Sequence, residues 1–173
     1  MPDLNINYIE IQSPIGPLVL AAAGERLCHI EFGSFADAGS KLETWSKRWY
    51  GSSQWSCTPS PLLVDAEKQM EQYFAGERKV FDISLDLRGT PFQIKVWEAL
   101  TRIPYGQVCS YKDIGQAIQS EKAVRAVGGA NNRNPVPIIV PCHRVIGADG
   151  SLVGYGGGLN VKIHLLQHEG YAV

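Results

Sequence analysis

A cysteine and a histidine stand side by side in the segment Pro141-Cys142-His143-Arg144-Val145, directly after an apolar run. The thiolate form of cysteine attacks electrophilic carbon, and a neighbouring imidazole can take the proton from the thiol. A lone cysteine also occurs as a small buried apolar residue, so the pair by itself leaves both interpretations open. The segment makes Cys142 a candidate nucleophile, to be judged from the elements that hold it.

The remaining cysteines and histidines do not form a pattern typical of a metal site. His164 and His168 stand four residues apart, but no acidic or thiol partner completes a ligand set. Gly154-Tyr155-Gly156-Gly157-Gly158 is too irregular for a nucleotide-binding G-x-G-x-x-G motif. The four cysteines are far apart and include no C-x-x-C pair: Cys28, Cys57, Cys109 and Cys142. We therefore expect neither a metal ion nor a cofactor.

Length and composition are those of a globular protein. With 173 residues, 45% hydrophobic and 19% charged, the chain can bury one core or two small ones. No basic start precedes an apolar stretch and no run of about eighteen apolar residues occurs, so we expect a cytoplasmic protein with no membrane partner. A nuclear location stays open for a eukaryotic chain.

Charge is divided unequally along the chain. Residues 1–87 hold 7 Lys and Arg against 12 Asp and Glu, whereas residues 88–173 hold 9 against 5. A net positive second half weakly favours a polyanionic partner. Solvent-exposed surfaces that differ in charge, with no such partner, would give the same pattern.

The first half reads as a small α/β domain with an antiparallel sheet, covering residues 1–87. Strands are predicted at 7–12, 18–23 and 27–32, where apolar stretches alternate with Gly and Pro turns. Helices are predicted around 42–50 and from Ser60-Pro61 to Phe74, and a further strand at 80–85. Residues 86–89 are the expected linker.

The second half, residues 88–173, reads as a mainly α domain. Thr90-Pro91-Phe92-Gln93 has the form of a capping box, so a helix should run from 91 to about 100 with Phe92, Val96 and Leu100 on its buried face. Ser110 should cap a helix to 118, and Ser120 another over 121–131. Two short helices across a tight connection predict a helix-turn-helix of the winged-helix kind, although any small α domain can contain such a pair. Together with the sheet expected in the first half, this gives an α+β fold class.

The helix predicted at 121–131 is rich in small residues, among them Gly128, Gly129 and Ala130, with Lys122 and Arg125 projecting farther. A glycine in a helix costs about 1 kcal/mol relative to alanine, so a pair of them needs a reason. Close approach of the helix backbone to a neighbouring helix would be a sufficient reason, and so would close approach to a nucleic-acid groove.

Rigid backbone leads into the candidate nucleophile. Asn134-Pro135-Val136-Pro137 is extended, and residues 138–140 are apolar enough for a buried strand that ends at Cys142. The glycine-rich loop at 154–158 leaves space for a bulky planar ligand, and Asn160 is expected to cap the last helix, which ends at Gly170.

These segments together resemble the alkylguanine-DNA alkyltransferase family. The resemblance is carried, in order along the chain, by Ile103-Pro104-Tyr105-Gly106, residues 125–130, residues 134–138, residues 141–145, Tyr155-x-Gly157-Gly158 and His168-Glu169-Gly170. It covers residues 90–173 closely, and Ser13 to Leu18 and Tyr73 to Gly76 resemble the family's more variable N-terminal part.

The resemblance implies direct repair of DNA in a single turnover. Cys142 would accept the alkyl group irreversibly from oxygen-6 of guanine, with oxygen-4 of thymine left open as a second substrate. His143, acting through water and backed by Glu169, would generate the thiolate. Tyr111 would donate its hydroxyl proton toward the base ring, and Asn134 would brace the active-site turn. The carbonyls of Cys142 and Val145 would accept from the exocyclic amine of the base.

Recognition of double-stranded DNA follows from the same resemblance. The target nucleotide must be extruded from the stack, and Arg125 would fill the space that it leaves. Gly128, Gly129 and Ala130 would approach the minor groove, with Arg144 also counted among the DNA-binding residues. Val145, Tyr155 and Gly156 would line the base pocket. We expect the protein to act as a monomer.

Departures and alternatives accompany the resemblance. Some family members carry serine where Gly156 stands, so a side-chain hydroxyl contact is missing and a wider pocket is a hypothesis. Certain members bind zinc through N-terminal residues, and Cys28, His29 and Cys57 do not reproduce that set. A non-catalytic binder of alkylated DNA that recruits other repair factors is the alternative function, and a cysteine hydrolase is a third.

Overall fold

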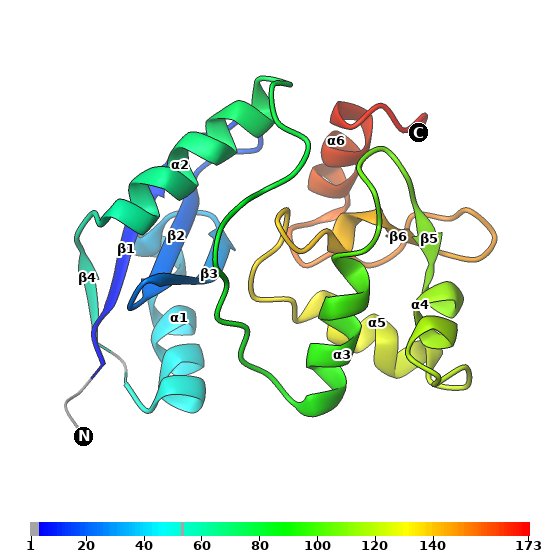
Figure 1. Cartoon of the computed structure of the whole chain (residues 1–173), viewed down its shortest axis with the longest axis horizontal. Coiled ribbons are helices and arrows are strands. Elements are labelled where there is room, and N and C mark those ends of the chain that lie inside the picture. The colour runs from blue at the N-terminus through cyan, green and yellow to red at the C-terminus, as the bar shows by residue number, and fades with distance from the viewer. Residues whose placement is uncertain (1–3, 53) are drawn as a thin grey trace. The chain divides into compact units, whose positions relative to one another are not determined.

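The computed structural model describes residues 4–52 and 54–173 and divides the chain into two compact units, Met1–Arg88 and Gly89–Val173 (Figure 1). The first unit is built on a mixed sheet and the second on helices, so the predicted α+β class is confirmed. Each unit has its own core.

A four-stranded sheet in the order β3-β2-β1-β4 forms the first unit. Strands β1 (Ile6–Ile11), β2 (Leu18–Ala23) and β3 (Arg26–Phe32) make the expected antiparallel meander. Strand β4 (Trp55–Cys57), which the sequence pattern did not indicate, pairs parallel with β1. Strand β2 is buried at five consecutive positions, which is typical of a strand covered on both faces.

Two capped helices complete the first unit. Helix α1 (Phe35–Tyr50) begins earlier than predicted because the Ser34 side chain accepts from the backbone N–H of Asp37. Helix α2 (Pro61–Phe74) has Ser60 as its N-cap and proline at its first turn, as predicted. Trp45 and Tyr50 of α1 pack against the sheet at Ile6, Ala21 and Cys28.

The strand predicted at 80–85 is wrong. The segment forms a single bridge, between Leu27 and Leu85, and no longer ladder. The side chain of Gln69 takes the place of a partner strand, because its amide nitrogen donates to the carbonyl of Asp82 at 2.9 Å and its oxygen accepts from Asp82 N at 2.8 Å.

Four helices frame the second unit: α3 (Pro91–Leu100), α4 (Tyr111–Ala117), α5 (Val124–Asn132) and α6 (Leu159–His168). Helix α3 has the predicted Thr90/Gln93 capping box, and Ser110 caps α4 through a second box with Asp113. Val96 and Leu100 are buried, whereas Phe92 is half-buried. Helix α5 contacts both α3 and α4.

Two caps predicted in the second unit are wrong. Helix α5 starts three residues later than expected and has no side-chain cap, because a turn from the Ser120 carbonyl to Ala123 N comes first. Helix α6 begins after Gly158, and Asn160 lies inside its first turn. In both places a backbone turn replaces the side-chain cap.

The segment that leads to Cys142 also departs from expectation, because residues 138–140 do not form a strand. Ile138 has φ 75°, in the left-handed region, and Val140 N donates back to Val136 O at 3.0 Å. The chain therefore turns tightly on itself before a 3-10 turn, η1 (Cys142–Arg144), and a short strand, β6 (Val145–Ile146). Strand β6 pairs parallel with β5 (Cys109–Ser110).

Candidate active site

Cys142 lies at the start of the η1 turn with 4% of its surface exposed. Asn134 holds the backbone that leads to it. The Asn134 amide nitrogen donates to Val140 O at 2.7 Å, and its oxygen accepts from Val136 N at 3.0 Å. Both polar atoms of this side chain thus bind the backbone of the turn that leads to Cys142.

The surroundings of the thiol act on its acidity in opposite directions. Burial raises the pKa of the Cys142 thiol, because a thiolate loses its hydration there. Hydrogen bonds from the side chains of Asn134 and Tyr155, and the positive charge of Lys162, lower the same pKa. Burial is the largest effect, so the pKa of the thiol lies above its usual value and the neutral thiol is favoured near pH 7.

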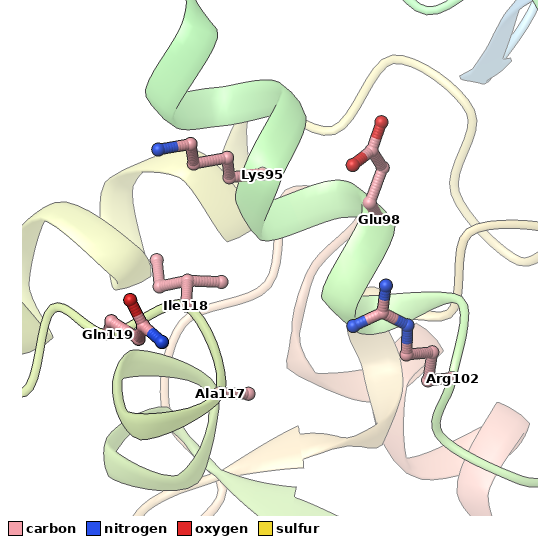
Figure 2. A pocket seen from close by; sticks show the side chains of 6 residues that line it. All are labelled: Lys95, Glu98, Arg102, Ala117, Ile118 and Gln119. Atoms are coloured by element: carbon pink, nitrogen blue, oxygen red, sulfur yellow. The ribbon is translucent and has the colours of Figure 1, made fainter.

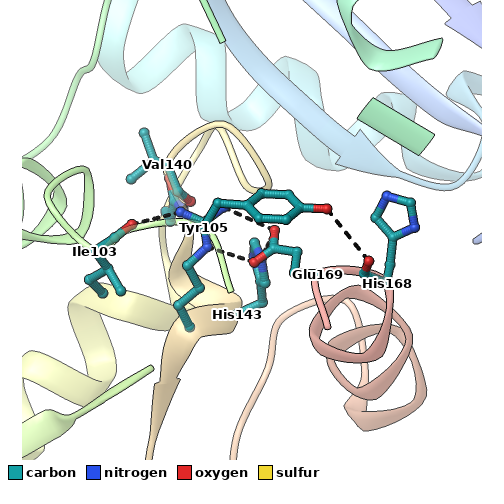
Figure 3. A network of polar contacts seen from close by, with 8 residues as sticks. Ile103, Tyr105, Val140, His143, His168 and Glu169 are labelled. Carbon is teal, nitrogen blue, oxygen red and sulfur yellow. Dashed lines mark hydrogen bonds and ion pairs between the residues drawn. The ribbon is translucent and has the colours of Figure 1, made fainter. Parts of the chain in front are cut away.

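His143 is the base expected for this thiol, and its ring is buried beside Glu169. Its Nε2 lies 2.8 Å from Oε2 of Glu169, and neither side chain is exposed to solvent by more than 1% (Figure 3). Burial lowers the pKa of His143, so the imidazole is neutral near pH 7. Hydrogen bonds from His143 and Arg144, together with the positive charge of Arg144, hold the pKa of Glu169 far below its usual value despite burial.

These charges fix the tautomer of the imidazole. An ionised carboxylate can only accept hydrogen bonds, so Nε2 of His143 carries the proton that points to Glu169. Nδ1 then has a free lone pair, and it is buried with no hydrogen-bonding partner among the described residues. This nitrogen is therefore able to accept a proton.

Arg144 departs from its expected role. Its side chain is buried, with Nε 2.7 Å from Oε1 of Glu169, Nη2 3.0 Å from Oε2, and Nη1 2.7 Å from the carbonyl of Ile103. The Tyr105 ring lies over the guanidinium at 5.7 Å. The prediction that Arg144 contacts DNA is corrected, because its donors are used inside the protein to hold Glu169.

Tyr111 starts helix α4, and its hydroxyl donates to the carbonyl of Val153 at 3.0 Å. The same carbonyl accepts from Nζ of Lys162 at 3.3 Å, and Lys162 also donates to the carbonyl of Val145 at 2.5 Å. In this structure, therefore, the Tyr111 hydroxyl and the Val145 carbonyl, both expected to contact the base, have partners within the protein.

The predicted DNA-facing residues of α5 separate into two groups. Arg125 and Gly129 are exposed, and a Cβ atom added at Gly129 would meet nothing within 4 Å. The small size of Gly129 is thus not needed for packing inside the chain. Ala130 is buried, and its carbonyl accepts from the indole N–H of Trp97 at 2.8 Å, so Ala130 faces α3 and its predicted place on the DNA face is corrected.

Gly128 and Gly156 each lie close to a neighbouring group. A Cβ atom at Gly128 would stand 4.0 Å from the ring of Tyr111, an ordinary contact. At Gly156 it would stand 3.3 Å from the carbonyl oxygen of Asn132, so the glycine loop fits closely against the end of α5. Tyr155 and Gly156 belong to this loop, and their place in a base pocket stays a prediction.

Lys162 is a residue of the site that the sequence reading missed. It is fully buried on α6, on the same helix face as the core residues Leu165 and Leu166, which follow it by three and four positions. A lysine on an apolar helix face was a readable signal, because such a charge needs buried partners. Its ammonium finds them in the carbonyls of Val145 and Val153.

Two other thiols, those of Cys28 and Cys109, are less suited to nucleophilic attack, because both favour the neutral form. Burial raises the pKa of Cys28 to about 12 and that of Cys109 to about 11. Within residues 4–52 and 54–173, no three or more His, Cys, Asp or Glu side chains gather as metal ligands, and no helix is long and apolar enough to cross a membrane.

A surface pocket in the second unit is lined by residues of α3 and of the segment that ends α4, and it shares none with the predicted site. Its lining residues are Lys95, Glu98, Arg102, Ala117, Ile118 and Gln119 (Figure 2).

Comparison with known proteins gives matches over nearly the whole chain. Residues 91–171 match the family model of the 6-O-methylguanine DNA methyltransferase DNA binding domain, and residues 6–87 match the ribonuclease-like domain of the same family. The methylated-DNA–protein-cysteine methyltransferase of Mycobacterium tuberculosis is 49% identical over 165 residues, covering 95% of this chain and 92% of that protein.

Two further matches agree. The methylated-DNA–protein-cysteine methyltransferase of Methanosarcina acetivorans is 46% identical over 163 residues, covering 94% of this chain and 97% of that protein. The crystal structure of Mycobacterium tuberculosis OGT in complex with DNA superposes with a TM-score of 0.81 at 46% identity, covering 94% of this chain and 92% of that one.

Proposed function

The chain belongs to the 6-O-methylguanine DNA methyltransferase family, and we propose that it repairs DNA by moving an alkyl group from oxygen-6 of guanine to its own Cys142. This makes it a methylated-DNA–protein-cysteine methyltransferase that acts once per molecule. The observation that carries the assignment to Cys142 is the buried His143–Glu169 pair beside the acceptor turn, which holds a neutral imidazole with one free nitrogen.

The first step removes the thiol proton. Nδ1 of His143 has no direct hydrogen bond to Cys142 or to any other described residue, so a water molecule carries the proton between them. Glu169 stabilises the imidazolium that forms, and Arg144 keeps Glu169 ionised and fixed from its other side. The thiolate then receives hydrogen bonds from Asn134 and Tyr155 and lies in the field of Lys162.

The second step transfers the alkyl group. The thiolate attacks the alkyl carbon, an S–C bond forms, and the bond from that carbon to oxygen-6 breaks with its electron pair left on guanine. Tyr111 supplies a proton to the base ring, which neutralises the leaving guanine. The proton held by the imidazolium of His143 then passes through water to the Tyr111 phenolate, so that both side chains return to their starting state. No group of the site is placed to cleave the stable thioether, so each molecule reacts once.

DNA is held by the second unit. The exposed Arg125 of α5 fills the space left by the extruded nucleotide, and Gly128 and Gly129 let the helix backbone approach the minor groove. Contacts to the phosphates, rather than to base edges, suit a protein that must act in any sequence. Helices α4 and α5 form the helix-turn-helix in this proposal.

The roles of the two halves of the chain and the cellular location of the protein follow from the same assignment. Residues 1–87 and 88–173 act as separate domains, with binding and chemistry in the second; matches to two different domain models support this division. The protein works in the cytoplasm as a monomer without cofactor, since the transfer needs none and the relatives named above come from cells without a nucleus.

Mass spectrometry tests the proposal. One equivalent of duplex DNA containing O6-methylguanine should leave a single methyl group on the Cys142 peptide and unmodified guanine in the DNA, with no second turnover. A protein that binds the lesion and stays unmodified would instead be a non-catalytic damage binder. Repeated turnover without retained methyl would indicate a hydrolase.

A further inference from the structure

Asn131 is a buried polar residue that the proposed reaction does not use. It lies near the end of α5 with 1% of its surface exposed, and its amide nitrogen donates to the carbonyl of Cys142 at 3.4 Å. Its amide oxygen is buried and accepts no hydrogen bond from any described residue. Burying a hydrogen-bond acceptor without a donor costs free energy, so the presence of this unpaired oxygen near Cys142 needs a reason.

The neighbouring asparagines show that this situation is particular to Asn131. Asn134 uses both its amide nitrogen and its oxygen in the acceptor turn, and Asn132 is exposed to solvent. The helix cannot turn Asn131 toward solvent, because the adjacent carbonyl of Ala130 is fixed by the indole N–H of Trp97 at 2.8 Å. The Asn131 oxygen is therefore held in the interior by the packing of α5.

The acceptors expected to meet the base are already engaged in this structure. The carbonyl of Cys142 accepts from Val145 N and from the amide nitrogen of Asn131. The carbonyl of Val145 accepts from the ammonium group of Lys162 at 2.5 Å. The exocyclic amine of guanine has two N–H donors. The Asn131 side chain, which reaches the carbonyl of Cys142 through its nitrogen, also carries an oxygen that lacks a donor among the described residues.

We propose that Asn131 is a specificity residue for guanine: its amide oxygen accepts one N–H of the exocyclic amine of the extruded base, beside the carbonyl of Cys142. The inference rests on the proposed function. Cys142 is itself 4% exposed, so the site must open for any base to reach the sulfur, and the same opening brings the amine to Asn131. A base without this amine leaves the oxygen unpaired and binds less well.

Two substrates that differ by this amine test the proposal. The native chain is given duplexes with O6-methylguanine or with O6-methylhypoxanthine, which lacks the exocyclic amine, and the second-order rate of methyl transfer is measured. Native protein should favour the guanine lesion. Asn131→Leu, of similar size but without the amide, should lower the rate on O6-methylguanine about tenfold, the effect of one hydrogen bond, and leave the rate on O6-methylhypoxanthine within about twofold.

Asn132→Ala is the matched control, one residue away and exposed, with its amide near Gly154 of the glycine loop. It should change both rates by the same factor and keep the preference for the guanine lesion. Equal losses on both substrates would mean that Asn131 only supports the turn, and no loss on either would mean that it has no role; both results overturn the proposal. If Asn131→Leu does not fold, as judged by thermal melting, Asn131→Ala and the preference of the native protein decide. A native chain that transfers from neither base would instead refute the proposed function.

Discussion

Replacing Arg144 with methionine distinguishes two roles for this residue that predict opposite results. The family resemblance predicted a DNA contact for it, whereas in the structure its guanidinium donates to Glu169 and to the carbonyl of Ile103 and lies against the ring of Tyr105. Methionine keeps much of the length of the side chain and removes the charge. Glu169 would then remain buried and ionised, with His143 still hydrogen-bonded to it but without the positive charge beside it.

The expected loss of stability is large. The substitution removes hydrogen bonds of 2.7 and 3.0 Å to the carboxylate and one of 2.7 Å to the backbone. Breaking a buried ion pair from one side costs about 3–5 kcal/mol, because an uncompensated charge is left behind. An arginine that only touched phosphate from the surface would change the free energy of unfolding by at most about 0.5 kcal/mol.

Urea unfolding and DNA titration at several salt concentrations measure the two roles separately. Arg144→Met should lower the free energy of unfolding by the amount given and leave the salt dependence of DNA affinity unchanged. Arg125→Met is the control on the exposed face of α5, and it should weaken DNA binding with little change in stability. A stable Arg144→Met protein whose salt slope falls by about one would refute the reasoning and restore the DNA contact.

Three further outcomes are expected. Cys142→Ser should abolish methyl transfer, measured by mass spectrometry, while lesion binding in a gel-shift assay stays within a few-fold; loss of both would give the cysteine a structural role. Gly129→Ala should raise the free energy of unfolding by up to about 1 kcal/mol, since the added methyl meets nothing, yet weaken DNA binding; unchanged affinity would exclude close approach there. Acidification from pH 5 to pH 3 should destabilise the protein, because the pKa of Glu169 is lowered in the folded state. The stability that this gives is complete above the pKa of about 4.3 of a glutamate in the unfolded chain, and it decreases below that pH as the unfolded chain takes up the proton. Glu169→Gln should show a smaller loss over that range in urea unfolding, and an equal loss would assign the effect to other carboxylates.

Elements with a local signal were predictable from the sequence. The capping boxes at Thr90 and Ser110 and the proline that opens α2 are side-chain devices, so the start of each helix is written in adjacent residues. The start of α5 was missed because a backbone turn after Ser120 comes first, and such a turn has no side-chain signature.

Elements that depend on distant contacts were not predictable. Residues 80–85 have an apolar pattern that fits a strand, yet Gln69 from α2 occupies the backbone of Asp82. Residues 138–140 read as a buried strand, but Ile138 adopts a positive φ so that Asn134 can close the turn. Each case depends on a side chain that the local pattern does not contain.

The site shows the same limit. Neighbouring residues in the sequence indicated Cys142 and His143, and the resemblance to a family supplied Tyr111, Asn134 and Glu169 as expectations. Arg144 was assigned to DNA because an arginine beside a reactive centre gives no sign of whether it faces outward. Its burial follows from Glu169, which is 25 residues away along the chain.

Trp97 gives this protein a built-in optical reporter. It is the one tryptophan after residue 88, since the other three are Trp45, Trp49 and Trp55. Its indole N–H is bonded to the helix that carries Arg125 and Asn131, so any movement of α5 changes the environment of the ring. Replacing the three earlier tryptophans with phenylalanine would leave a single emission band through which the seating of α5 can be followed in real time as damaged DNA is added.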